Sequence, residues 1–195
     1  MSNRPLNIWP LLGTRVYAVR RGDTVGGCVV AAEYTGTPPS QTKGKPEFSA
    51  ANWPMLGVVS SIQPRIEYAS HSRTISNPDG TLEEETKKVI KAAFLDVGLD
   101  ALNDIAFEQA FGLAKLTSGT EQIPFSQPDP FFLGWLVFES QDADGTGDNV
   151  IVGHLWCELR LKDMPKFGPK DRPGCNLRAQ KKYSTLNTIE INQPA

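Results

Sequence analysis

A long stretch of alternating side chains, from Leu56 to Ser76, constrains the fold of this chain more than any other feature. Apolar side chains recur at even positions, and polar or charged side chains occupy many of the positions between them. Because successive side chains of a β-strand point to opposite faces of a sheet, this period predicts a strand with one face on a core. Pro64 predicts a bend or an edge position, since proline cannot donate a hydrogen bond to a neighbouring strand. The apolar set is Leu56, Val58, Ile62, Ile66 and Tyr68.

The same period recurs nearer the C-terminus. Residues 149–163 and 174–192 each alternate between apolar and polar side chains, so each is predicted to form one long strand. Residues 131–138 are apolar on both faces, which is typical of a central strand covered on both sides. With shorter β-rich stretches at 15–20 and 25–34, the pattern predicts a mainly β fold with antiparallel pairing. The apolar side of 174–192 consists of Cys175, Leu177, Ala179, Tyr183, Ile189 and Ile191.

One α-helix is predicted from Asp100 to Gly112. Asp is a favourable N-cap and Gly a favourable terminator, and the segment carries apolar residues at helical spacing. The preceding segment, 86–97, fits two structures: its apolar residues fit one face of a helix, but Ile90, Ala92 and Phe94 also alternate as in a strand. Because Glu, Lys and Ala favour helices, the pattern taken alone slightly favours a helix there.

Length and composition indicate one soluble domain. The chain has 195 residues, 39% of them hydrophobic and 22% charged, which is enough for one buried core. Its net charge of −2 lacks the basic excess of proteins that wrap nucleic acid. We expect no signal peptide and no membrane contact, because the longest apolar run, Phe131–Phe138, is far shorter than the roughly 20 residues of a spanning helix. Three widely spaced cysteines favour synthesis in a reducing cytoplasm.

The candidate catalytic and metal sites are each better explained by structure. The acidic segment 142–149 has the first oxygen ligands of a calcium-binding EF-hand loop, but Gly153 stands where that loop needs its closing glutamate. Its Asp-Gly pair is typical of a β-hairpin turn instead. His154 and Cys157 are three residues apart, so a strand places them on opposite faces and prevents proton sharing. The chain has no glycine-rich phosphate-binding motif, and we predict no enzymatic activity, no cofactor and no metal.

Two oppositely charged segments suggest contacts between copies of the chain. Residues 79–108 have eight acidic and three basic side chains, whereas residues 158–183 have eight basic and three acidic ones. Most such segments are simply solvated faces. The alternative is head-to-tail association, in which the acidic surface of one copy meets the basic surface of the next. The candidate residues are Glu83, Glu84 and Glu85 on the acidic side and Lys162, Lys166, Lys170 and Arg172 on the basic side.

A long polar segment, 36–52, is a further candidate for binding. It has 17 residues and is rich in Gly and Pro, and a loop of this length is uncommon in a small domain unless it serves as a binding element. We expect it to be mobile in the free protein and to be ordered by a partner.

The order of these features resembles that of phage major tail proteins, which form the tail tube. The resemblance spans residues 53–192. In that family the segment before the helix is a strand, so we expect a strand at 86–97. The matching pieces are Trp53–Val59, Lys88–Val97, the helix from Leu99 to Phe107, the strand Gly134–Glu139, the turn at 142–149 and the terminal strand ending at Ile191.

The resemblance implies a mainly β (α+β) single domain over residues 1–195, built as an antiparallel β-sandwich or half-barrel with one flanking α-helix. It also implies hexameric rings that stack head to tail into a tube, through which DNA passes transiently. The partners would be other copies of the chain and further tail proteins: the tape measure, the terminator and the baseplate or tip. The protein would be made in the host cytoplasm and reside in the virion. We assign the N-terminal arm, residues 1–14, and the 36–52 segment to contacts between rings, with Pro38, Pro39, Lys43, Lys45 and Phe48 as candidates.

A close variant of this function is another ring component of a tail, such as a terminator, or the inner tube of a secretion or bacteriocin apparatus. Two other classes of function stay open. A monomeric β-barrel would bind a small ligand between its sheets, with Trp135, Phe138 and Trp156 lining the pocket. An enzyme using the acidic turn and His154 is the least favoured class, since we find no third residue to orient His154.

Overall fold

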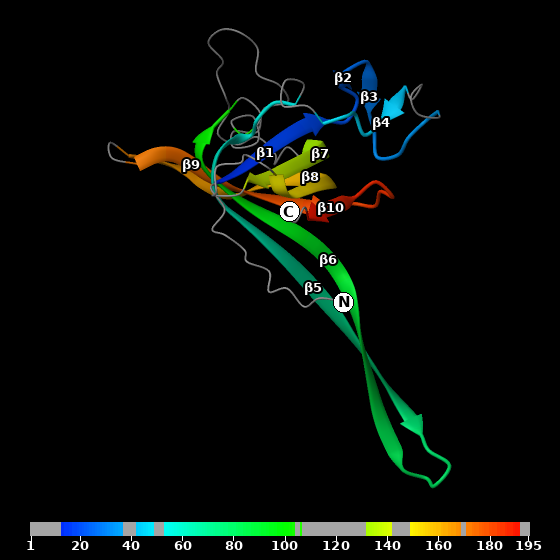
Figure 1. Cartoon of the computed structure of the whole chain (residues 1–195). Coiled ribbons are helices and arrows are strands. Elements are labelled where there is room, and N and C mark those ends of the chain that lie inside the picture. The colour runs from blue at the N-terminus through cyan, green and yellow to red at the C-terminus, as the bar shows by residue number, and fades with distance from the viewer. Residues whose placement is uncertain are drawn as a thin grey trace, which may run out of the picture.

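The strands of this chain form one large curled sheet and one small sheet. Figure 1 shows the computed structural model, which describes residues 13–36, 42–48, 53–103, 106, 132–141, 149–168 and 171–191. The strands are β1 (Gly13–Arg20), β2 (Thr24–Val25), β3 (Cys28–Val30), β4 (Lys43–Gly44), β5 (Gly57–Ser76), β6 (Leu82–Leu102), β7 (Phe132–Gln141), β8 (Asn149–Gly168), β9 (Asp171–Lys181) and β10 (Thr188–Ile191). Among the described residues, the large sheet has the order β1-β7-β8-β9-β6-β5 with β10 beside β8, and its pairs are antiparallel. The small sheet has the order β2-β3-β4, and its β3–β4 pair is parallel.

The large sheet curls until its first and last strands meet at one end. The amide of Leu56 donates to the carbonyl of Val16 (2.6 Å), and the amide of Ala18 donates to the carbonyl of Pro54 (3.1 Å). These bonds join the chain at the start of β5 to β1. Farther along, β5 and β6 run away from the other strands, so the curl stays open there (Figure 1). The described residues confirm a mainly β fold with antiparallel pairing, but they do not show a sandwich.

The inner core fills the concave side of the large sheet. Because every second residue of a strand faces this side, β1, β6, β7, β8 and β9 each contribute two or three buried members. The buried members include Cys157 of β8 and the residues Cys175, Leu177 and Ala179 of β9, which the alternating pattern places on an apolar face. This part of the prediction is confirmed. The members are Val16, Ala18, Leu56, Leu95, Val97, Leu99, Ala106, Phe132, Leu136, Cys157, Leu159, Cys175, Leu177 and Ala179.

The outer core covers the opposite face of β1, β7 and β8. The rings of Trp135 and Trp156 lie 5.4 Å apart, and the indole nitrogen of Trp135 donates to the carbonyl of Ala31 at 2.8 Å. The ring of Phe48 lies 5.1 Å from that of Tyr17. β7 is therefore buried on both faces, as its sequence predicts. The buried members are Tyr17, Val19, Val30, Trp53, Trp135, Val137 and Trp156.

The structure corrects the predicted helix start. β6 continues to Leu102, so Asp100 lies in a strand and is not a helix cap. Asn103 takes that role, because its side-chain oxygen accepts a hydrogen bond from the amide of Ala106 (3.0 Å), as an N-cap does. Ala106 is helical and buried, but the rest of the predicted helix, up to Gly112, lies outside the described residues. The described residues alone therefore do not show the expected flanking helix.

The segment 86–97 lies within β6, so the strand expected from the resemblance is confirmed and the helical preference of the pattern is wrong. The segment does not form a helix because β6 pairs in the antiparallel direction with β5 along its length and with β9 at its base. Pairing with neighbouring strands overrides a weak local propensity.

The predicted single strand at 174–192 is two strands, β9 and β10, that pair with different parts of β8. The chain turns between Lys181 and Thr188, and the side chain of Asn187 fixes this turn by accepting a hydrogen bond from the amide of Trp156 (2.6 Å). The turn leaves Tyr183 82% exposed and Ile189 exposed as well, so their predicted burial is wrong. A polar side chain that bonds a distant backbone group is not visible in a period-two pattern.

Candidate functional site

β5 and β6 form a hairpin whose outer part leaves the large sheet. Among the described residues, β6 pairs with β9 only from Phe94 to Leu99. Toward the tip of the hairpin, β5 and β6 pair only with each other (Figure 1). We call residues 66–93 the projecting hairpin. Within the described part of the chain, neither of its outward edges has a strand partner. Open edges invite pairing, and a two-stranded hairpin is marginally stable alone, so this element has the properties of one completed by a partner.

One face of the projecting hairpin is apolar near the body of the protein. Tyr68 pairs directly with Ile90, and Ile66 pairs with Ala93, so each pair shares a face of the hairpin. Tyr68 is 58% exposed and Ile90 is 59% exposed. The alternation at 56–76 therefore predicts the strand correctly, but the expected burial of Val58, Ile66 and Tyr68 is wrong. Val58 is 50% exposed beside a register shift between β5 and β6, whereas Ile66 and Tyr68 lie past the end of the inner core.

The tip of the projecting hairpin is a well-bonded turn. The carboxylate of Asp79 accepts hydrogen bonds from the hydroxyl (2.6 Å) and the amide (2.9 Å) of Thr81, which lower the pKa of Asp79. The amide of Asn77 donates to the carbonyl of Thr81 (2.8 Å). Gly80 has a φ of 81°, which glycine adopts without strain. The turn is thus held in one shape before any partner arrives.

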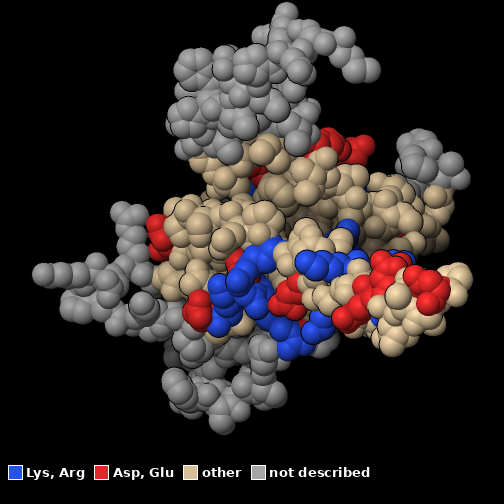
Figure 2. All heavy atoms as spheres, turned by 90° about the horizontal axis from the view of Figure 1, so that it is seen from below, with Lys and Arg blue, Asp and Glu red and all other residues tan. Residues whose placement is uncertain are grey.

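This tip is acidic and ends in an exposed apolar side chain. Residues 74–85 carry four carboxylates and no Lys or Arg. Glu85 pairs across the hairpin with Arg73 (2.5 Å), whereas Glu83 and Glu84 are exposed. Leu82 beside them is 73% exposed. Figure 2 shows acidic side chains gathered toward the end of the hairpin and basic side chains across the middle of the same view.

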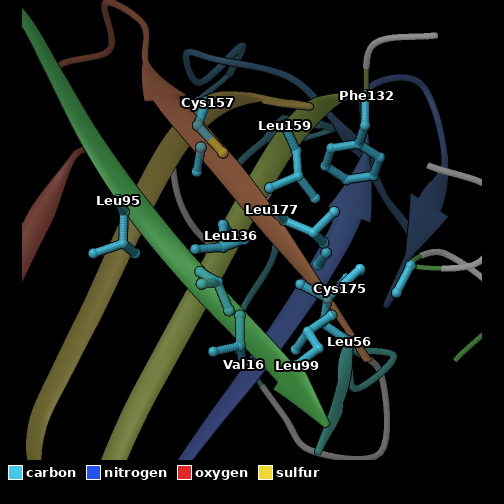
Figure 3. Packing of buried hydrophobic residues seen from close by; sticks show 14 residues of the cluster. Val16, Leu56, Leu95, Leu99, Phe132, Leu136, Cys157, Leu159, Cys175 and Leu177 are labelled. Carbon is cyan, nitrogen blue, oxygen red and sulfur yellow. The ribbon is translucent and has the colours of Figure 1, made fainter. Parts of the chain in front are cut away.

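An apolar groove of about 720 Å³ opens where the hairpin leaves the sheet. Ile62 lines it from the base of the hairpin, and Phe138 and Ile189 line it from β7 and β10. Arg65 and Lys181 are the cationic residues of its lining, and none of the described lining residues carries a carboxylate. Ile62 and Phe138 also pack on the inner core, whose side chains Figure 3 shows pointing toward one another from several strands. The groove is thus the open end of the inner core.

An ion cluster fixes the base of the hairpin to β8 and β9. The buried carboxylate of Asp96 accepts hydrogen bonds from Nε (2.8 Å) and Nη2 (3.1 Å) of Arg178 and from Nζ of Lys162 (3.0 Å). Arg65 of β5 lies 3.6 Å from the same carboxylate. Arg178 first, and Lys162 after it, hold the pKa of Asp96 at about 2 against the opposing effect of burial. Part of the charge complementarity of the sequence is therefore satisfied inside one chain.

We expect the substitution Asp96→Asn to lower the free energy of unfolding by about 2 kcal/mol at neutral pH, which is the value of a pKa held at about 2 instead of 3.8. Because the folded-state pKa is the lower one, the unfolded chain takes up the proton first. The stabilisation is complete above about pH 4 and disappears as the pH falls toward 2. Urea unfolding of both proteins across this pH range measures the difference.

The control for this experiment is Asp163→Asn, at an exposed carboxylate of β8 that accepts a hydrogen bond from Asn176 (2.9 Å). Its effect should stay within about 0.5 kcal/mol at every pH. A difference between wild type and Asp96→Asn that persists at pH 2 would contradict the role of the ionised carboxylate.

The acidic and basic residues predicted from the charge pattern do not lie together. Glu83, Glu84 and Glu85 lie at the tip of the projecting hairpin, and Lys162 lies in the ion cluster at its base. Lys166 and Arg172 lie in β8 and β9, with their side chains outside the described residues, and Lys170 is wholly outside them. Within one chain, Lys162 therefore meets Asp96 and not the tip acids.

Residues 42–48 of the predicted long loop pack on the main body. Lys43 is exposed in β4, whereas Lys45 and Phe48 are half-buried beside the outer core. The described contacts of Lys45 and Phe48 are therefore contacts within one chain. Pro38 and Pro39 lie outside the described residues, as does the N-terminal arm up to residue 12.

His154 and Cys157 lie on opposite faces of β8, as predicted. Cys157 is in the inner core, where burial raises the pKa of its thiol. The alternation at 149–163 puts His154 on the polar face of the strand, but His154 is also buried, with its ring 6.3 Å from Phe48, so this part of the prediction is wrong. Burial, assisted by the charge of Lys45, lowers the pKa of His154 to about 4. Two neutral groups on opposite sides of a sheet do not form a nucleophile–base pair.

The ligand pocket predicted from three aromatic residues is wrong. Trp135 and Trp156 are packed against each other in the outer core, whereas Phe138 lines the groove on the other side of β7. Within the described ranges, no group of three or more His, Cys, Asp or Glu side chains is placed to hold a metal ion. The described residues also contain no helix with the length and apolar character to cross a membrane.

Comparison with known proteins finds structural likeness alone. No protein-family model matches the chain, and no curated protein matches it in sequence. Among solved structures, it is similar to the sheath/tube terminator of an extracellular contractile injection system, PVC, in the extended state (8% identity, TM-score 0.44, 97% of this chain and 99% of the other covered). It is also similar to a chain of the PVC sheath–tube complex in the extended state (8%, 0.46, 98% and 100%) and to the tube-terminating cap of the anti-feeding prophage (10%, 0.37, 70% and 85%). With every TM-score below 0.5, these likenesses do not establish a family.

Sequence reasoning did not single out the groove, the ion cluster or the exposed Leu82. The available signal for the cluster was Asp96, a lone carboxylate within the apolar run 92–99. A buried acid needs a cationic or hydrogen-bonding partner, so such a residue predicts an ion pair. The groove had no signal, because its lining comes from seven strands and one turn that are distant in sequence.

Proposed function

We propose that this chain is a structural subunit of a phage-type tail tube, which assembles with identical copies into hexameric rings that stack into a conduit for DNA ejection. The observation that carries the proposal is the projecting hairpin, whose two edges have no strand partner among the described residues and which has an exposed apolar face. Such edges pair readily with another chain. A closed ring of copies would satisfy them in every subunit and leave no edge free for uncontrolled association.

The composition and the sequence resemblance support the same function. A conduit must let DNA pass without tight binding, and a chain with a net charge of −2 neutralises few phosphates. Under this proposal the protein resides in a virion tail, and its partners are its own copies and other tail proteins. The N-terminal arm and the 36–52 segment would contact the neighbouring ring, with the exposed Lys43 as the described candidate nearest the surface.

The double substitution Tyr68→Thr/Ile90→Thr should weaken assembly without unfolding the protein. Thr keeps a β-branched side chain on each strand but removes most of the apolar surface that this pair presents. We expect the concentration required for assembly to rise at least about tenfold, since each exposed apolar side chain buried in an interface contributes on the order of 1 kcal/mol or more. Light scattering after size-exclusion chromatography, with negative-stain electron microscopy, measures the effect.

The matched control is Tyr183→Thr, which removes a still more exposed tyrosine from the turn before β10. It should assemble like wild type. Wild-type protein that stays a monomer at high concentration, with no rings or tubes in the microscope, overturns the proposal.

A second candidate function is a monomeric protein that binds a small apolar ligand in the groove. The volume of about 720 Å³ and the largely apolar lining favour it, since ligand pockets commonly span about 300–1,000 Å³. A stable monomer with saturable binding of an apolar fluorescent dye would support this candidate over the tube.

A further inference from the structure

We propose that the acidic tip of the projecting hairpin of one copy docks into the apolar groove of the next copy. This inference rests on the proposed self-assembly and names the contact that holds neighbouring subunits together. The partner is a second copy of this chain, because the tip and the groove are complementary in both charge and polarity.

The tip carries an apolar side chain and negative charge, which match the apolar lining and the positive charge of the groove. Leu82 is an exposed apolar side chain at the end of the hairpin, and the groove has an apolar lining that none of the described residues fills. The carboxylates of Glu83 and Glu84 follow Leu82 directly in sequence, while Arg65 and Lys181 line the groove. No described lining residue carries a carboxylate, and the nearby Asp96 is outnumbered by its cationic neighbours Arg65, Arg178 and Lys162, so an acidic tip meets a net positive charge there.

The tip of a chain cannot reach the groove of the same chain. The groove lies at the base of the projecting hairpin, and from Tyr68 to Ser76 the strand extends roughly 26 Å away from it, at about 3.3 Å per residue. The contact must therefore join two copies. Since different surfaces meet on the two sides, the contact is head-to-tail, and its repetition gives a closed ring or a continuous filament.

Both surfaces are formed before they meet. The hydrogen bonds of Asp79 and Asn77 to Thr81 hold the shape of the tip. The ion cluster around Asp96 holds the base of the hairpin, and with it the wall of the groove that contains Ile62. Association then loses little conformational entropy, which favours binding.

Disulfide trapping between copies tests the contact directly. In the double variant Leu82→Cys/Ile189→Cys, one new thiol lies at the exposed tip and the other lies in the groove lining. The three native cysteines are free and buried, so they do not compete under mild oxidation. We expect a ladder of covalent oligomers on a non-reducing gel. The control Leu82→Cys/Tyr183→Cys, with the second thiol at an exposed site that is not part of the groove lining, should give no ladder.

Charge reversal tests the electrostatic part of the contact. The tip variant Glu83→Lys/Glu84→Lys and the groove variant Arg65→Gln/Lys181→Glu should each raise the concentration required for assembly by about tenfold. An equimolar mixture of the two should assemble again, because the basic tips now match the acidic grooves. The control Arg21→Glu, at an exposed cation in the turn after β1, should assemble like wild type. Circular dichroism of each variant establishes that it is folded.

The outcomes separate this inference from the proposed function. Rings or tubes that form without a disulfide ladder, and that do not respond to charge reversal, overturn the docking but leave the tube. Wild-type protein that never assembles overturns both. A groove that binds an apolar dye equally well in the assembled and the dissociated protein also overturns the docking, because a bound tip would exclude the dye.

Discussion

Replacing Trp135 by alanine should lower the free energy of unfolding by about 3–5 kcal/mol, the usual effect of truncating a fully buried tryptophan. Trp135 has no exposed surface, and its ring packs against Trp156 in the outer core. Its indole nitrogen also donates to the carbonyl of Ala31, the residue that follows β3. The substitution therefore opens a cavity and detaches the small sheet from the large one. Urea unfolding followed by far-ultraviolet circular dichroism measures the loss.

The conservative variant Trp135→Phe separates the two contributions. It retains an aromatic ring in the outer core but leaves the carbonyl of Ala31 without its indole donor, so it should lose about 1–2 kcal/mol. Hydrogen exchange of residues 24–30 should then rise in both variants, and more in the alanine variant. A loss below 1 kcal/mol for Trp135→Ala would contradict the view that this ring holds the two sheets together.

The substitution Gly134→Ala should be nearly as damaging, with a loss of about 3 kcal/mol or more, although it adds one methyl group. A Cβ atom at this position would lie 2.0 Å from the carbonyl oxygen of Val19 and 2.9 Å from the ring of Phe132. The ring has some freedom to move, but the carbonyl belongs to the neighbouring strand β1, so relief requires a shift of backbone. The thermal midpoint and the yield of soluble protein should both fall.

Gly13→Ala is the matched control for this experiment. Gly13 begins β1, and a Cβ atom there meets no atom within 4 Å. The same chemical change should therefore be neutral or slightly stabilising, since alanine restricts the unfolded chain more than glycine does. Equal losses at the two positions would show that strand propensity, not the close approach to β1, decides the effect.

These core variants and the hairpin variants act on different properties of the molecule. Trp135 and Gly134 contact buried groups, so their replacement changes stability. Tyr68 and Ile90 are mostly exposed and lie opposite each other on the projecting hairpin, so their replacement should change association and leave the free energy of unfolding nearly unaltered. This contrast distinguishes failed assembly from failed folding.

Much of the fold could be predicted from single residues and their spacing. The alternation at 56–76 and at 149–163 identifies β5 and most of β8, and the apolar run at 131–138 identifies the strand buried on both faces. The predicted helix start is wrong because Asp100 can cap a helix only where the chain leaves the sheet. The chain leaves the sheet at Asn103 instead. The prediction of a single terminal strand is wrong because the turn at 182–187 depends on a hydrogen bond from the amide of Trp156 to the side chain of Asn187. No local pattern in the sequence reveals this bond.

The candidate site was only partly foreseeable. The acids Glu83, Glu84 and Glu85 were found from their charge, but the groove that they are proposed to enter was not. Arg65 and Lys181 are more than a hundred residues apart, and only the curl of the sheet brings them to one opening. The charge of a segment can be counted from its sequence, whereas a groove forms only where segments distant in sequence pack together.

The sequence by itself determined which residues extend as strands and which side chains share a face, because both follow from local backbone geometry with a period of two. Only the tertiary structure decided which of those faces are buried, because burial needs a second surface supplied by distant residues. Leu95 and Ile90 belong to the same strand and are both apolar, yet Leu95 lies in the inner core and Ile90 faces solvent. The difference is that β6 is covered near its base and, within the described chain, is left without cover along the projecting hairpin.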